Sequence, residues 1–241
     1  MSSRQDARLL TGNQLLDYLP QAVYSRLRHS LKSVQLPKGK VLYEVGDEVH
    51  HAYFVTSGMV SLLSATDDGA TVEVAMVGSE GLAGVPAVLR NNSTPYRSVV
   101  QLPASAMRIR AAALDAEFAR CGQLQDSLLR YLHTLLTQIS QSAICHRYHT
   151  IEQRLCRWLL VSRDCTHSDT FHLTQESLSY MLGVQRTGVT AVAGALRSAK
   201  LIRYRRGEIQ VLDVRGVEAA SCECYQIVRE QIRHLVAAYG R

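Results

Sequence analysis

Short apolar stretches that alternate with polar residues dominate the chain from residue 34 to about residue 109. Examples are residues 40–43, 60–63 and 71–74. Strands of this length and spacing predict an all-β sandwich or barrel. The sequence Asp67-Asp68-Gly69 predicts a hairpin turn, because Asp and Gly tolerate the positive φ that tight hairpin turns demand.

The hydrophobic period changes between about Leu124 and Cys145, where apolar residues recur every three or four positions. This spacing predicts an amphipathic helix of roughly six turns. The helix could lie on the β domain, or its nearly heptad stripe could pack on the same helix of a second chain. We expect a homodimer. Its expected interface residues are Leu128, Leu132, Leu135 and Ile139, with Leu129, Leu136 and Ala143 widening the stripe.

A further helix is expected to begin at Thr150, because Thr150 and Gln153 have the spacing of a capping box. Its apolar positions run to about Val161, and the polar residues 162–168 are expected to form a loop. We therefore place a domain boundary between Cys145 and Thr150.

Two short helical patterns follow, with the spacing of a helix-turn-helix. Thr174 can cap the first helix, and Gly183 can form the turn. The apolar positions expected to face inward are Leu178, Met181, Leu182, Val189, Val192 and Leu196. A helical hairpin that contacts protein has the same spacing, so this pattern alone does not establish DNA binding.

The second helix would present its N-terminal residues to the major groove of double-stranded DNA. The projecting side chains are Gln185, Arg186, Thr187 and Thr190. Arg186 is the first candidate for reading a base, because a guanidinium can donate two parallel hydrogen bonds to guanine. Residues 201–212 alternate on both sides of Gly207, which predicts a two-stranded wing. Its arginines Arg203, Arg205 and Arg206 would face phosphates.

Charge supports this interpretation. The 241-residue chain has a formal net charge of +6, and after Cys145 it has 14 basic and 9 acidic residues. A basic segment attracts a polyanion, because neutralising phosphates releases condensed counterions. An apolar fraction of 46% can supply a core. The sequence contains neither a membrane span nor a signal peptide, so we expect a cytoplasmic protein without membrane partners.

Four β-roll motifs and one C-terminal block of this sequence resemble the Crp/Fnr family of bacterial transcription regulators. The β-roll motifs are Leu36-Pro37-Lys38-Gly39, Gly46-Asp47, Gly58-Met59-Val60 and Gly69, and the block is LTQESLSYMLGVQRTGVTAVAGALRSAKLIRY. The resemblance implies an α+β fold with three parts. These are a cyclic-nucleotide-binding-like jelly roll (1–122), a dimerisation helix (123–147) and a winged helix-turn-helix domain (150–241).

The resemblance also implies which side chains touch bases. The family's three common base-contacting positions fall on Arg186, Thr187 and Ala191, and only the arginine is retained. In the sensor domain, a phosphate cassette would involve Gly84, Arg97 and Ser98. Val85 stands where nucleotide-binding members have a glutamate, so we do not expect cyclic AMP binding.

No cofactor, metal or catalytic residue is expected. The six cysteines show no CxxC pairing and look like reduced structural thiols, and the first is Cys121, too late for an N-terminal iron–sulfur cluster. Haem would need axial ligands, for which His50, His51, His146 and His149 are the candidates. The string 78–81 is not a nucleophile elbow, because Val77 replaces its first glycine.

The sequence therefore predicts a homodimeric regulator that reads palindromic operators, with an unidentified small-molecule effector or none, and with RNA polymerase as a partner. The alternative is a ligand-binding or protein-interaction module, such as a cyclic dinucleotide receptor, that does not read DNA sequence. The arginine-rich wing favours the regulator.

Overall fold

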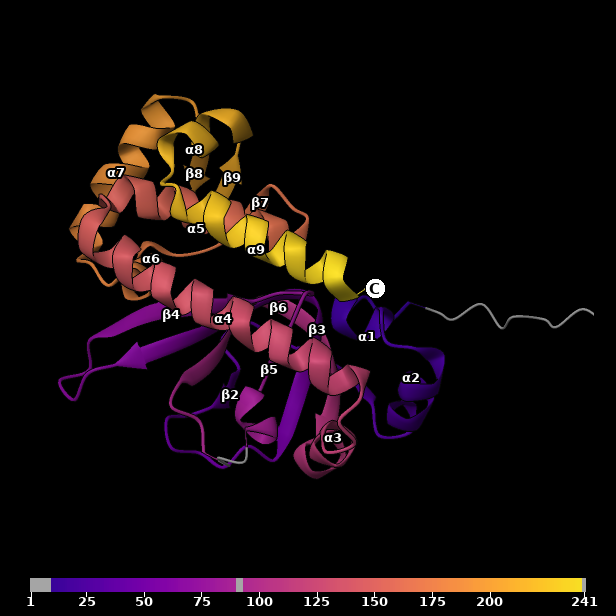
Figure 1. The fold of residues 1–241 in the computed structure, drawn as a ribbon. Coiled ribbons are helices and arrows are strands. Elements are labelled where there is room, and N and C mark those ends of the chain that lie inside the picture. Colours follow the sequence, from indigo (N-terminus) through magenta and orange to yellow (C-terminus); the bar gives the residue numbers. More distant parts are fainter. Residues whose placement is uncertain (1–9, 90–92, 240–241) are drawn as a thin grey trace, which may run out of the picture.

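The computed structural model describes residues 10–89 and 93–239, with a β-rich N-terminal part, a long helix and a mainly helical C-terminal part (Figure 1). Two short helices that the alternating pattern does not predict come first, α1 (Gln14–Asp17) and α2 (Gln21–Arg28). The predicted strands follow. They are β1 (Lys32–Leu36), β2 (Val41–Tyr43), β3 (His51–Ala65), β4 (Thr71–Val77), β5 (Leu82–Ala83) and β6 (Arg97–Arg110).

These strands form one antiparallel sheet in the order β1-β6-β3-β4, with β2 paired to β6 and β5 paired to β3. The expected hairpin joins β3 to β4, where the N–H of Thr66 donates to the carbonyl of Ala70 and Gly69 has a φ of +88°. The register of β3 against β6 shifts around Gly58, whose φ is +79°. A Cβ there would lie 2.1 Å from the carbonyl oxygen of Pro103, so only glycine fits.

The long helix α4 (Gln123–Tyr148) crosses the β-roll, preceded by the 3-10 turn η1 (Val85–Val88) and by α3 (Ala111–Phe118). Leu124, Leu128 and Leu135 of α4 belong to the same apolar core as the strands. The helix is thus part of the N-terminal core as well as the connection to the C-terminal part.

The helix α5 (Ile151–Thr166) begins at the predicted capping box, in which Thr150 Oγ1 accepts from the N–H of Gln153. The expectation of a loop from residue 162 is wrong, because the helix continues to Thr166. Ser162 is fully buried, with its hydroxyl 3.8 Å from the sulfur of Met59, and Cys165 is buried as well. Contact with the β-roll therefore extends a helix whose local sequence is polar.

The C-terminal part combines helices with a small antiparallel sheet in the order β7-β9-β8. Its elements are β7 (Thr170–His172), α6 (Gln175–Leu182), α7 (Arg186–Ser198), β8 (Ile202–Arg205), β9 (Glu208–Val211), α8 (Val214–Ala220) and α9 (Cys224–Tyr239). The last helix runs back beside α4 towards the β-roll (Figure 1). There the hydroxyl of Tyr239 donates to the carbonyl of Glu80 at 3.3 Å.

A second apolar core joins the C-terminal part to the β-roll. Met59, Met76 and Leu102 of the sheet pack in one cluster with residues of α5 and α6, including Trp158 and Leu182. The two parts therefore share buried apolar surface and are not merely tethered by the long helix.

Candidate nucleic-acid interface

The helix pair α6–α7 has the predicted helix-turn-helix geometry. Thr174 Oγ1 accepts from the N–H of Ser177 at 3.1 Å, which caps α6. Gly183 ends α6 with a φ of +58°, and this left-handed conformation makes the turn into α7. The inward residues expected from the spacing are buried or half-buried: Leu178, Met181, Leu182, Val189, Val192 and Leu196.

The exposed face of α7 presents the residues that were expected to contact DNA. Gln185 precedes the helix, Arg186 is its first residue, and both are exposed together with Thr187 and Thr190. The Thr190 hydroxyl lies 2.9 Å from Oε1 of Gln175 and 2.9 Å from the carbonyl of Arg186. Thr190 therefore braces α7 against the start of α6.

Gly188 lies where α7 approaches α5. A Cβ at Gly188 would be 2.9 Å from Cδ1 of Ile151. A larger residue at this position would require the Ile151 side chain to shift, whereas glycine inside a helix costs about 1 kcal/mol relative to alanine.

The wing is a hairpin of β8 and β9, in which Arg203 pairs with Gln210 and Arg205 with Glu208. Arg203 and Arg205 are two residues apart, so they lie on one face of β8, and both are exposed. Arg206 forms the turn with a φ of +52°, a conformation uncommon outside glycine.

A concave surface of about 390 Å³ lies between the start of α6, the face of α7 and the wing. Its lining residues are Thr174, Gln175, Arg186, Thr190, Ala193, Gly194, Arg197, Tyr204, Arg206 and Gly207. Three of them are arginines, and among the described residues no acidic side chain lines it. Such a surface suits a phosphate backbone, because guanidinium groups bind phosphate oxygens in bidentate fashion.

Arg197 belongs to this surface but was not among the expected contacts. It lies eleven residues after Arg186, which is about three helical turns, so the two share a face of α7. The helical spacing between Arg186 and Arg197 would have been enough to predict this position from the sequence. Arg203 and Arg205 do not line the concavity and extend along β8 instead.

The start of α7 also lies beside the β3–β4 hairpin of the same chain. Gly69, Ala70 and Thr71 line one depression together with Gln185 and Arg186. The start of α7 thus borders the β-roll of the same chain.

A smaller cavity of about 170 Å³ lies in the β-roll beneath α4. Apolar side chains dominate its lining, and α4 contributes Leu132, Leu135, Leu136 and Ile139. Of the expected effector residues, Gly84 and Ser98 line it, as does Val85. Arg97 does not line it and instead forms an ion pair with Glu44, with Nε 3.0 Å from Oε2.

The four residues expected at a homodimer interface have different environments. Leu128 and Leu135 are buried in the core of their own chain, whereas Leu132 and Ile139 are half-buried on α4. The surface between the latter two contains Leu136, which is 63% exposed. Leu129 and Ala143, also exposed, continue this line. The expected stripe thus divides into a core-facing side and an exposed side.

Comparison with known proteins agrees with this architecture. A model of the cyclic nucleotide-binding domain matches residues 33–121, and a model of the Crp-like helix-turn-helix domain matches residues 153–220. The global nitrogen regulator of Nostoc sp. is 25% identical over 185 residues, which are 72% of this chain and 82% of that protein. The global nitrogen regulator of Synechococcus elongatus is 24% identical over 195 residues, 76% of this chain and 86% of that protein.

Solved structures show the same fold. A transcriptional regulator of the Crp/Fnr family from Eubacterium rectale superposes with a TM-score of 0.68 at 15% identity, covering 86% of this chain and 96% of its own. FixK2 from Bradyrhizobium japonicum superposes with a TM-score of 0.67 at 14% identity, and the superposition covers 80% of this chain and 98% of FixK2.

A winged helix-turn-helix behind a cyclic-nucleotide-binding-like β-roll defines a DNA-binding transcription regulator and not an enzyme. The two domain models together match more than half of the chain, and the chain belongs to the Crp/Fnr family. Over the described residues, none of the helices has the length and apolar character needed to cross a membrane.

Proposed function

We propose that this chain acts as a homodimer on palindromic operators and that Arg186 reads a base in each half-site. The observation that carries the proposal is the exposed guanidinium of Arg186 at the start of α7, on one surface with Arg197 and Arg206. Bidentate donation from an arginine to guanine discriminates bases by about 1–3 kcal/mol. The other arginines would hold the phosphates and fix the register of the helix in the groove.

The exposed side of α4 supports dimerisation. An apolar line on α4 is formed by residues spaced by three and four positions, Leu129, Leu132, Leu136, Ile139 and Ala143. Within one chain Leu129, Leu136 and Ala143 are exposed, and Leu132 and Ile139 are half-buried. Such a line fits the seam of two paired helices. A twofold dimer would bring two copies of α7 to major grooves about 34 Å apart.

The cavity beneath α4 suggests how a signal would reach the dimer. Leu132 and Ile139 line the cavity and also belong to the apolar line. A small effector bound there would change the packing of α4 and hence the spacing of the two reading helices. The apolar lining and Val85 favour an effector other than cyclic AMP. In the cytoplasm, the DNA-bound dimer would contact RNA polymerase.

Genome-wide capture of DNA by the purified full-length protein tests the proposal. A shared palindrome with half-sites one helical turn apart is the expected result. Fragments without a shared motif would contradict it and favour the interaction module, which predicts binding without sequence preference. One protein of the same fold, at 16% identity and a TM-score of 0.61, is a c-di-GMP responsive global regulator. The DNA capture should therefore be repeated in the presence of cyclic dinucleotides.

A further inference from the structure

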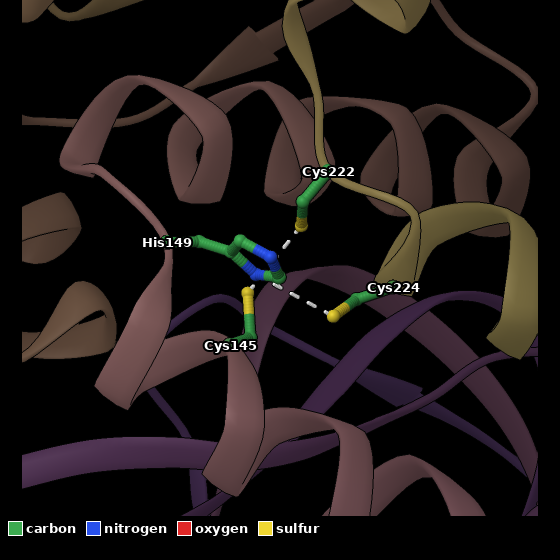
Figure 2. A group of neighbouring side chains, drawn as sticks. All are labelled: Cys145, His149, Cys222 and Cys224. Carbon is green, nitrogen blue, oxygen red and sulfur yellow. Dashed lines mark hydrogen bonds between the residues drawn. The ribbon is translucent and has the colours of Figure 1, made fainter.

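Three cysteines and a histidine from two distant parts of the sequence meet at one point (Figure 2). Cys145 lies in the last turn of α4, and His149 is the residue that ends this helix. Cys222 and Cys224 come from the junction between α8 and α9. Each offers one ligand atom, and the four atoms all lie within 4.8 Å of one another.

Two of the distances between these atoms match those around a single tetrahedral ion, and the others are at most 4.8 Å. The sulfurs of Cys145 and Cys222 are 3.6 Å apart, and the sulfur of Cys224 is 3.6 Å from Nδ1 of His149. Zinc–sulfur bonds of about 2.3 Å and a zinc–nitrogen bond of about 2.0 Å place tetrahedral ligands about 3.5–3.8 Å apart. The side chains are therefore almost in ligating positions.

The histidine ring is oriented as metal-bound histidines are. Its Nδ1 faces the sulfur of Cys224, while Nε2 lies 3.2 Å from a carboxylate oxygen of Glu223. A ligating histidine usually donates its other ring N–H to a carboxylate, which fixes the tautomer and the ring orientation. Glu223 stands in that position, between the two cysteines.

Burial and charge also suit a metal. All three cysteines are at most 3% exposed, and together they form a small cluster apart from the two main cores. The guanidinium of Arg157 is buried close to the Cys145 thiol. Three thiolates and Zn²⁺ sum to a charge of −1, which one guanidinium balances.

We propose that Cys145, His149, Cys222 and Cys224 form a structural Zn²⁺ site. Four protein ligands close a tetrahedral shell, which is the arrangement of structural rather than catalytic zinc. A disulfide between Cys145 and Cys222 would leave the third thiol and the imidazole without a role. The compact ligand set encloses one ion, whereas an iron–sulfur cluster needs room for several atoms.

The position of the site gives it a mechanical role. It fastens the start of α9 to the junction of α4 and α5, and the far end of α9 is held to the β-roll by Tyr239. The helix α9 lies beyond the matched helix-turn-helix region, which ends at residue 220. Zinc would thus couple an additional C-terminal helix to the helix proposed for dimerisation.

Elemental analysis of the purified, reduced full-length protein is the first test, and we expect stoichiometric zinc. Exchange for Co²⁺ should give the visible bands of tetrahedral cobalt and a near-ultraviolet thiolate charge-transfer band. Cys222→Ser combined with Cys224→Ser should abolish both signals. The matched control is Cys121→Ser, an exposed cysteine outside the cluster, which should keep them.

Glu223→Gln tests the orienting carboxylate without removing a ligand. The variant should retain zinc, with an affinity reduced roughly 10- to 100-fold in competition with a chelator. If the cysteine variants do not fold, chelation of the unmodified protein still tests the site, because amide exchange should rise in residues 224–239. Protein that neither contains zinc nor takes up Zn²⁺ or Co²⁺ would overturn the proposal, as would a Cys145–Cys222 disulfide or stoichiometric iron with sulfide.

Discussion

The guanidinium of Arg97 is paired with the carboxylate of Glu44, with 3.0 Å between Nε and Oε2. Arg97 is therefore already engaged and lies outside the lining of the sensor cavity, which is mainly apolar and includes Val85. We predict that calorimetric titration with cyclic AMP gives no binding. Micromolar binding that Arg97→Ala abolishes would show that the ion pair opens to receive a phosphate.

The exposed line on α4 predicts the effect of a charge at its centre. Leu136→Glu should convert a dimer into monomers, because it places a carboxylate in an apolar seam. Sedimentation velocity measures the change. Arg130→Glu, also exposed on α4 but outside the line, should remain dimeric. Equal behaviour of the two variants would show that the chain does not dimerise through this line.

The wing predicts a second kind of DNA contact. Arg205→Ala should weaken binding to all sequences and reduce the dependence of log affinity on log salt by about one phosphate contact. Fluorescence anisotropy at several salt concentrations measures both quantities. An unchanged salt slope would show that Arg205 does not face the backbone.

Glu73 predicts a pH dependence of stability. Burial raises the pKa of this carboxyl from 4.5 to about 7, although its hydrogen bond with Ser61 and the charge of Arg157 oppose the shift. A raised pKa means that the folded state holds the proton more tightly, so its stabilising contribution is complete below pH 4.5 and is lost as the pH rises towards 7. The free energy of unfolding should fall by about 3 kcal/mol in all as Glu73 loses this contribution.

Urea unfolding at about pH 5 and about pH 8 measures this effect. Glu73→Gln is the control, because glutamine keeps a hydrogen-bonding group but does not titrate. The loss of unfolding free energy with pH should be smaller in the variant by roughly the stated amount. Identical pH profiles of the two proteins would contradict this assignment.

The sequence predicted the parts of the fold that depend on neighbouring residues. The Thr150–Gln153 capping box, the turn at Gly183 and the hairpin turn at Gly69 each follow from a few adjacent residues, and all are present. The exposure of Arg186 follows equally from the apolar spacing of α7. Local patterns were sufficient for these features.

Features that depend on distant contacts were not predictable in the same way. The helix α5 extends past Val161 because the β-roll covers its polar end, and Leu128 faces inward because the sheet lies beneath α4. Cys145 and His149 are four residues apart, and Cys222 and Cys224 are two apart, so each pair has a plausible metal-ligand spacing. Only the return of α9 to α4 brings the two pairs together, so a metal site could not be predicted from the spacing of either pair alone.

The most direct test of the central claim is the specificity of Arg186→Ala. It compares the Kd for a captured operator with the Kd for a scrambled duplex, and Arg28→Ala, an exposed arginine on α2, is the control. We predict that Arg186→Ala reduces the difference between the two binding free energies, which is RT ln of the Kd ratio, by about 1–3 kcal/mol for each half-site, while Arg28→Ala leaves it unchanged. A ratio in Arg186→Ala equal to that of the unmodified protein would contradict the assignment of α7 as the helix that reads DNA through Arg186.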